Sequence, residues 1–96
     1  MLEKLGEIDQ RFEKLTELLI KPETITDQKL FRKLSQEHSE LQEIVSAYRN
    51  YQKISQSIEA NLQILEDDSE DLELKDLARE EIKEFEAQSL DLTKQL

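Results

Sequence analysis

The feature that most constrains the fold is a run of about 39 residues, from Asp27 to Leu65, that contains neither glycine nor proline. Its apolar and aromatic residues recur every three or four positions, which is the period of one helix face. At about 1.5 Å per residue, such a helix would span about 58 Å. A compact chain of 96 residues has a radius of gyration of only about 13 Å. We therefore predict that this helix is the spine of a rod. The periodic series is Leu30, Phe31, Leu34, His38, Leu41, Ile44, Val45, Tyr48, Tyr51, Ile54, Ile58, Leu62 and Leu65.

Two shorter segments with the same periodicity flank the long one. Lys21-Pro22 is expected to end the first, because the proline ring clashes with the preceding helical turn. Six consecutive polar residues at 66–71, five of them acidic, separate the second segment from the third, because negative charge is unfavourable at a helix carboxyl end. The predicted fold is all-α, a three-helix antiparallel coiled-coil-like bundle with helices at about 2–20, 27–65 and 74–96.

Charge and composition exclude several classes of protein. The formal net charge is −10, and residues 67–96 carry 11 acidic against 4 basic residues, so phosphate is repelled over most of the surface. Free nucleic acid and anionic membranes are therefore poor candidates for a partner. The absence of cysteine fits an intracellular chain. No apolar run approaches the roughly 20 residues needed to cross a bilayer, and the first residues lack a secretory pattern. We expect a cytoplasmic chain that binds no membrane.

The sequence gives little support for catalysis, a cofactor or a metal. A single glycine cannot form a P-loop, a dinucleotide-binding loop or a nucleophile elbow. His38, the only histidine, is either a base or ligand paired with Glu37 or, in the interpretation we favour, a partly covered residue at the edge of a helix seam. The acids at 67–73 lack the glycine-centred calcium loop and are read as a solvated turn. We expect no enzyme activity and no cofactor.

Lys29, Arg32 and Lys33 form the only local basic patch of this acidic chain. Their spacing places them on one helix face. They are either, in the interpretation we favour, ordinary solvated positions with Glu37 as an ion-pair partner, or a contact for a phosphate backbone or an acidic protein. We name these three residues as the candidate partner-binding site. Tyr48 and Tyr51 could stack on a ligand if exposed, but their place in the apolar series favours a seam position.

Several stretches, taken in order, resemble one family. The chain is similar to the amino-terminal helical domain of bacterial peptide chain release factor 1, a class I translation termination factor, over essentially all of its 96 residues. The stretches that carry the resemblance are Thr26-Asp27-Gln28, Phe31-Arg32-Lys33-Leu34-Ser35-Gln36-Glu37, Leu41, Ile44-Val45, Tyr48, Tyr51, Asp67-Asp68 and Leu77-Ala78-Arg79-Glu80-Glu81-Ile82.

The resemblance implies a docking role without catalysis. The family's Gly-Gly-Gln loop and its codon-reading loop have no counterpart in residues 1–96, so no catalytic residue can be transferred. It further implies a single helical domain, a fragment of a larger release factor, that contacts the factor-binding region of the large ribosomal subunit and helps to communicate with the class II release factor GTPase. A stand-alone coiled-coil adaptor or oligomeric scaffold stays open as the alternative, as does weak self-association of the isolated domain.

Overall fold

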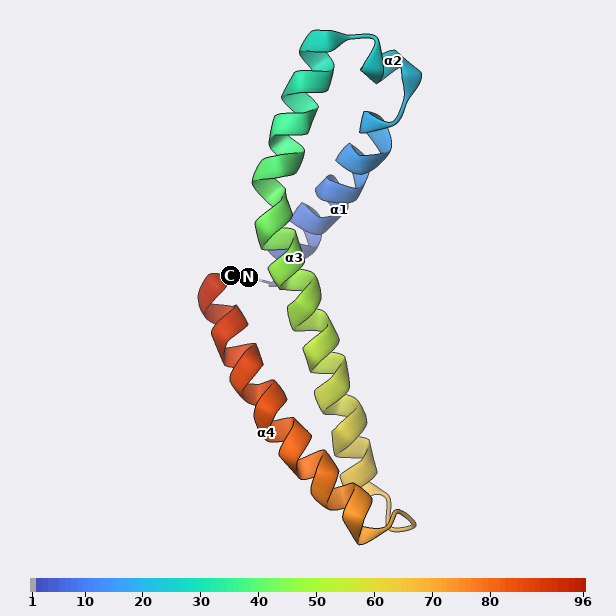
Figure 1. Cartoon of the computed structure of the whole chain (residues 1–96), viewed down its shortest axis with the longest axis vertical. Coiled ribbons are helices and arrows are strands. Elements are labelled where there is room, and N and C mark those ends of the chain that lie inside the picture. Colours follow the sequence, from blue (N-terminus) through green and yellow to red (C-terminus); the bar gives the residue numbers. More distant parts are fainter. Residues whose placement is uncertain (1) are drawn as a thin grey trace. The chain divides into compact units, whose positions relative to one another are not determined.

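The computed structural model describes residues 2–96, and this range contains helices and no strand (Figure 1). The predicted all-α fold with a long central helix is confirmed. One short helix between the first and second predicted helices was not expected from the sequence. The four helices of the described range are α1 (Leu2–Leu19), α2 (Pro22–Ile25), α3 (Gln28–Glu66) and α4 (Leu72–Gln95).

The short helix α2 begins at the proline that was predicted only to end α1. Pro22 occupies the first helical position, where its missing N–H costs nothing and its fixed φ suits the helix. The preceding Lys21 is extended, with φ −79° and ψ 137°, as expected before proline. Thr26 closes α2, since its hydroxyl donates to the Pro22 carbonyl over 3.0 Å. Pro22 therefore both ends one helix and starts the next.

Side-chain caps define where the two longer helices begin. The predicted cap Asp27 precedes α3, and its Oδ1 accepts a hydrogen bond from the Leu30 amide over 3.2 Å. Asp71 does the same for α4, accepting from the Leu74 amide over 2.8 Å. Because Asp71 takes this role, α4 starts at Leu72, two residues before the predicted position. The acidic stretch at 66–71 thus ends one helix and caps the next.

Asp67 organises the turn between α3 and α4. Its Oδ1 accepts hydrogen bonds from the Ser69 hydroxyl (2.6 Å) and the Ser69 amide (2.9 Å). These two bonds, with a smaller contribution from the charge of Lys75, lower the pKa of Asp67 below its ordinary value of 3.8. The stabilisation from the ionised carboxylate is therefore complete above pH 3.8 and is lost as the pH falls through the lowered pKa.

Replacing Ser69 by alanine is expected to raise the pKa of Asp67 toward 3.8, because the hydroxyl donor is the largest cause of the shift. A carboxyl-detected NMR titration would measure it. Ser55→Ala, an exposed serine within α3, is the matched control and should leave the Asp67 titration unchanged. An Asp67 titration that Ser69→Ala does not move would contradict the role of this bond.

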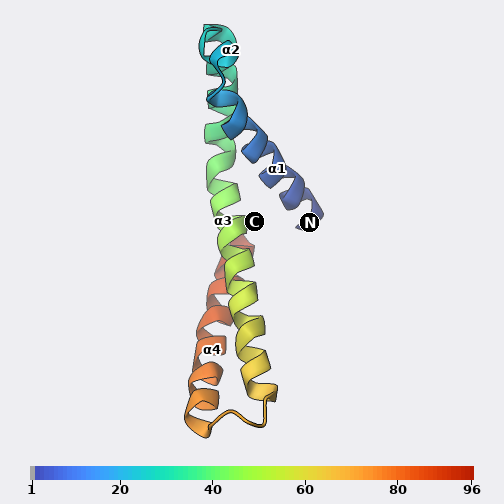
Figure 2. The same cartoon turned by 90° about the vertical axis from the view of Figure 1, so that its right-hand side faces the viewer.

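Backbone contacts group the chain into two compact units, residues Met1–Ser46 and Ala47–Leu96. In the first, α1 runs toward α2 and the first part of α3 runs back antiparallel to it, as the views from two sides agree (Figures 1 and 2). The core of this unit is small, as expected when two helices and one short helix cover one another. Its buried side chains are Leu5, Leu15, Thr24, Leu34 and Val45.

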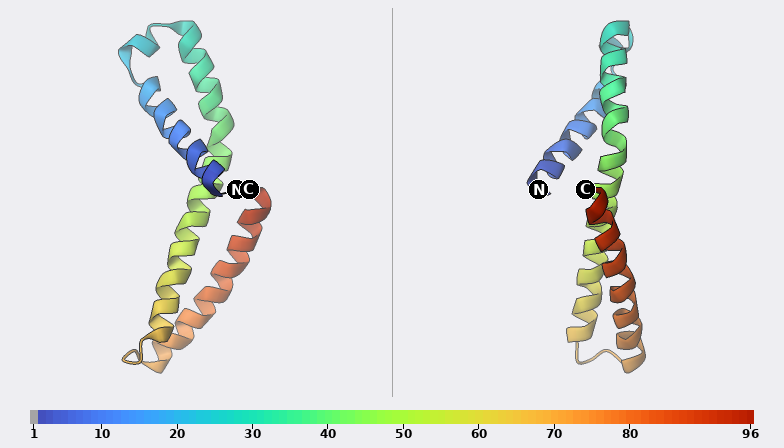
Figure 3. Two further views of the ribbon diagram at one scale, coloured as in Figure 1. Left: turned by 180° about the vertical axis from the view of Figure 1, so that it is seen from behind. Right: turned by 90° about the vertical axis from the view of Figure 1, so that its left-hand side faces the viewer.

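In the second unit, the last part of α3 and α4 lie side by side and antiparallel, joined by the Asp67 turn (Figure 3). Asn61 is buried and donates from Nδ2 to Glu81 Oε2 across the two helices over 3.1 Å. Tyr48 is also buried, so the seam position expected for it is confirmed, and its hydroxyl accepts from Gln52. The buried side chains of this unit are Tyr48, Ile54, Asn61, Ala78, Ile82 and Leu92.

Candidate docking surface

The candidate partner-binding residues lie in the first two turns of α3. Lys29, Arg32 and Lys33, called here the cationic cluster, are all exposed. None of their three side chains forms an ion pair or hydrogen bond with another residue of the range 2–96. Three exposed cations without an ion-pair partner are thus gathered within two helical turns of a chain whose net charge is −10.

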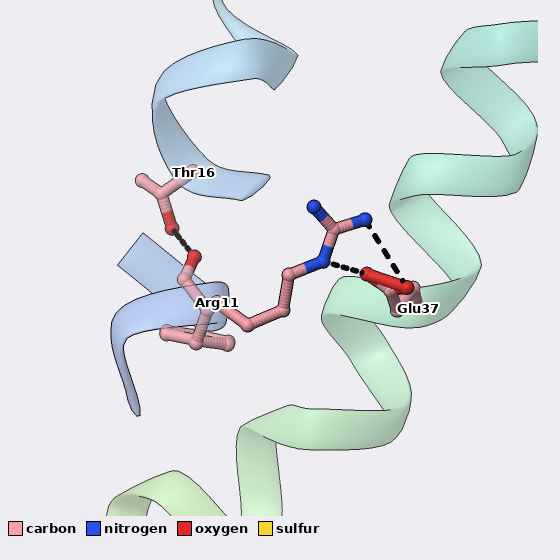
Figure 4. Close-up of polar contacts among 4 residues, drawn as sticks. Arg11, Thr16 and Glu37 are labelled. Atoms are coloured by element: carbon pink, nitrogen blue, oxygen red, sulfur yellow. Dashed lines mark hydrogen bonds and ion pairs between the residues drawn. The ribbon is translucent and has the colours of Figure 1, made fainter. Parts of the chain in front are cut away.

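Glu37, which the sequence offered as an ion-pair partner of the cluster, binds another residue. Arg11 of α1 reaches across to α3, with Nε 2.6 Å from Glu37 Oε2 and Nη2 3.3 Å from Glu37 Oε1 (Figure 4). The hydrogen bond to Glu37, and next its charge, raise the pKa of Arg11 above its ordinary value. The Glu37 carboxylate therefore pairs with Arg11 and forms no ion pair with the cationic cluster.

A shallow groove lies beside the cluster, and we call it the α2–α3 groove. Its volume is about 430 Å³, and it is lined by Ile25, Gln28, Phe31, Arg32 and Ser35. Ile25 is 54% exposed and Phe31 is 40% exposed, so the apolar surface of the groove is open to solvent. Phe31 was expected in the seam because it belongs to the periodic series, but of the first members of that series only Leu34 is buried.

Two of the three residues of the cationic cluster line depressions in the surface, and each lines a different one. Arg32 lines the α2–α3 groove, whereas Lys33 lines a smaller one of about 240 Å³ together with Arg11 and Glu37. Lys29 lines neither of them. Ile25 and Phe31 are the candidate site residues that sequence reasoning missed. The available signal was that Ile25 falls outside every periodic series and lies four positions before Lys29, the first residue of the cluster.

His38 lies at the edge of the seam, as the favoured interpretation proposed. Its ring stacks on Phe12 with centroids 4.2 Å apart and planes inclined by 21°, and Nε2 is 3.0 Å from Thr16 Oγ1. The Thr16 hydroxyl already donates its proton to the Phe12 carbonyl over 3.0 Å, so its oxygen accepts from His38 Nε2–H. The ring is therefore held by packing and by one hydrogen bond, and Glu37 is engaged elsewhere.

Two structural features are absent from the described part of the chain. Within residues 2–96, no three histidine or acidic side chains are grouped so that they could hold a metal ion. None of the helices in this range has a stretch long and apolar enough to span a bilayer.

Comparison with known proteins places these features in a family. Residues 8–96 match the family model described as the PCRF domain. The chain belongs to the PCRF-domain family. The resemblance to peptide chain release factor 1 is also confirmed, because curated proteins of that name match this chain along its whole length. Peptide chain release factor 1 of Clostridium tetani is 38% identical over 96 residues, all of this chain and 27% of that protein. Its counterpart in Alkaliphilus oremlandii is 42% identical over 86 residues, 90% of this chain and 24% of that protein.

The match to the PCRF domain includes the cationic cluster and every residue that lines the α2–α3 groove. The chain spans about a quarter of the length of the curated relatives that it matches. No solved structure matches it.

Proposed function

We propose that this PCRF-domain chain is the amino-terminal helical domain of a peptide chain release factor and that it acts in translation termination by docking. Its target is the factor-binding region of the large ribosomal subunit. The observation that carries the proposal is a cationic cluster without internal partners beside an exposed apolar groove, on a chain that resembles release factors along its whole length. Charges placed in this way steer association with a macromolecular surface of opposite sign.

The proposal includes the setting in which the domain works. Residues 1–96 act as a single helical domain of a larger cytoplasmic factor, without hydrolysing peptidyl-tRNA themselves. The class II release factor GTPase is a second proposed partner. The support is the family membership together with the residues present, since this stretch holds one glycine and so cannot form the family's Gly-Gly-Gln loop.

Neutralising the cationic cluster is expected to weaken binding to purified bacterial large ribosomal subunits by about tenfold or more, since each steering charge contributes up to about 1 kcal/mol. The variant is Lys29→Gln/Arg32→Gln/Lys33→Gln, because glutamine keeps the helix propensity of lysine and arginine. Co-sedimentation of the 96-residue chain with the subunits would measure the change.

The matched control is Lys53→Gln/Lys83→Gln/Lys94→Gln, which removes the same charge from exposed positions elsewhere and should bind like the parent chain. Equal losses in both variants would show that net charge alone governs binding. No binding by the parent chain would reject the docking role, and release of peptide from peptidyl-tRNA above the buffer background would reject the non-catalytic role.

A second candidate, the oligomeric scaffold, is favoured by one observation. Several leucines of the second unit are exposed, including Leu72 at 76% and Leu77 at 51%, and apolar surface of this kind can pair with a second copy. Sedimentation equilibrium separates the two functions. A monomer at micromolar concentration supports the docking domain, whereas an obligate oligomer supports the scaffold.

A further inference from the structure

We propose that the α2–α3 groove receives an acidic protein segment that carries a large apolar side chain, and that this segment is the contact through which the domain docks. The inference rests on the proposed docking function and names the chemistry of the partner. The observations that carry it are the apolar lining of the groove, its size, and the position of the free cations.

The lining of the groove fits an apolar side chain. Ile25 comes from α2 and Phe31 from α3, so the groove has one apolar residue from each helix. The side chains that complete it are the uncharged Gln28 and Ser35 and the cationic Arg32. A volume of about 430 Å³ lies in the range of about 300–1,000 Å³ typical of ligand sites. A leucine or phenylalanine entering it would remove apolar surface from water on both partners.

The charges around the groove fit a segment with acidic residues. Arg32 is part of the lining, and Lys29 and Lys33 lie one turn or less from it on α3. The nearby carboxylate of Asp27 accepts the Leu30 amide at the start of α3, and that of Glu37 is bound to Arg11. Neither carboxylate forms an ion pair with the three cations, so carboxylates on an incoming segment could pair with them. Apolar anchors with flanking charges are a common mode of peptide recognition.

The same observations disfavour RNA as the occupant. A phosphate backbone contacts cations and a base could stack on Phe31, but neither group offers an aliphatic side chain to cover Ile25. The first unit has ten acidic and seven basic residues, so a long polyanion would be repelled outside the cluster. A short protein segment with a few carboxylates avoids most of this repulsion.

A photo-cross-linking amino acid in the groove would identify the occupant directly. Gln28 lines the groove and is exposed, so we would replace it with p-benzoylphenylalanine in the 96-residue chain and irradiate its complex with purified large ribosomal subunits. The matched control carries the same group at the exposed Gln88 of α4. The expected result is an adduct at position 28 only, with a protein segment that is rich in Asp and Glu and contains a large apolar residue.

A second variant tests the apolar anchor without a bulky probe. Phe31→Gln is expected to weaken binding to the same subunits about fivefold. The glutamine side chain buries less apolar surface in the complex than the phenylalanine ring does. The control is Leu90→Gln, which replaces a 61% exposed leucine on α4 and should leave binding unchanged. Circular dichroism would establish that both variants keep the helical content of the parent.

The outcomes separate this inference from the proposed function. Adducts with ribosomal RNA, with a second copy of the chain or with a neutral or basic protein segment would overturn the inference and leave docking intact. The same holds for binding without any adduct at position 28, or for binding that Phe31→Gln does not change. If the parent chain does not bind the subunits, both the docking function and the inference are wrong.

Discussion

Replacing Leu15 by alanine is expected to lower the free energy of unfolding by about 2–5 kcal/mol. Leu15 is 0% exposed, and truncating it removes apolar contacts and leaves a cavity that neighbouring side chains fill only in part. The first unit has few buried side chains, so each carries a large share of its stability. A domain of this size is stable by only about 5–15 kcal/mol in total.

Urea denaturation followed by circular dichroism would measure the effect of Leu15→Ala. Leu2→Ala is the matched control on the same helix, because Leu2 is half exposed and its truncation should change the free energy of unfolding by no more than about 0.5 kcal/mol. If residues 1–96 form the proposed single domain, the whole helical signal should be lost in one transition. Equal stability of the two variants would contradict the assignment of Leu15 to the core.

The second large effect is expected from Asn61→Asp, at about 3 kcal/mol of destabilisation near neutral pH. Asn61 is 7% exposed and donates to Glu81 Oε2 over 3.1 Å. An aspartate has almost the same shape, but it would replace the donor by a carboxylate facing the Glu81 carboxylate. Burial and the like charge would both raise the pKa of the new group.

The pH dependence of this variant follows from that raised pKa. Well below the unfolded pKa of about 3.9 the aspartate is protonated in both the folded and the unfolded chain, so the penalty from ionisation disappears. It is small near that pH and grows as the pH rises above it. Urea denaturation of variant and parent at about pH 4 and about pH 7 would show this. Gln63→Glu, which adds one charge at an exposed position of α3, is the control and should be nearly neutral. A penalty of the same size at both pH values would show that Asn61 and Glu81 do not interact as described.

Helix ends were largely predictable because their causes are local. Asp27 caps α3 through its own side chain, and the restriction of Lys21 is imposed by the ring of Pro22. The short helix α2 was not predicted because the same proline both ends one helix and starts the next, and only the first effect is evident from its clash with the preceding turn. The start of α4 was placed two residues late because Leu72, exposed at 76%, lies outside the apolar period that marked the helix.

The candidate site was predictable only in part. The cationic cluster follows from spacing alone, because residues three and four apart share a helix face. The absence of an ion-pair partner for the cluster does not follow from spacing. It depends on Arg11, 26 positions before Glu37, which binds the carboxylate that the sequence offered to the cluster. The α2–α3 groove was equally hidden, because one wall comes from the unpredicted helix α2.

The sequence by itself determined that the chain is helical, that the long helix continues without a break, and where charge gathers, because turn-to-turn hydrogen bonds, capping and apolar period act within a few residues. Only the tertiary structure decided which apolar residues are buried. A single neighbouring helix covers a narrow stripe of α3, so Leu34 is enclosed while Phe31, three positions earlier in the same series, stays in contact with solvent.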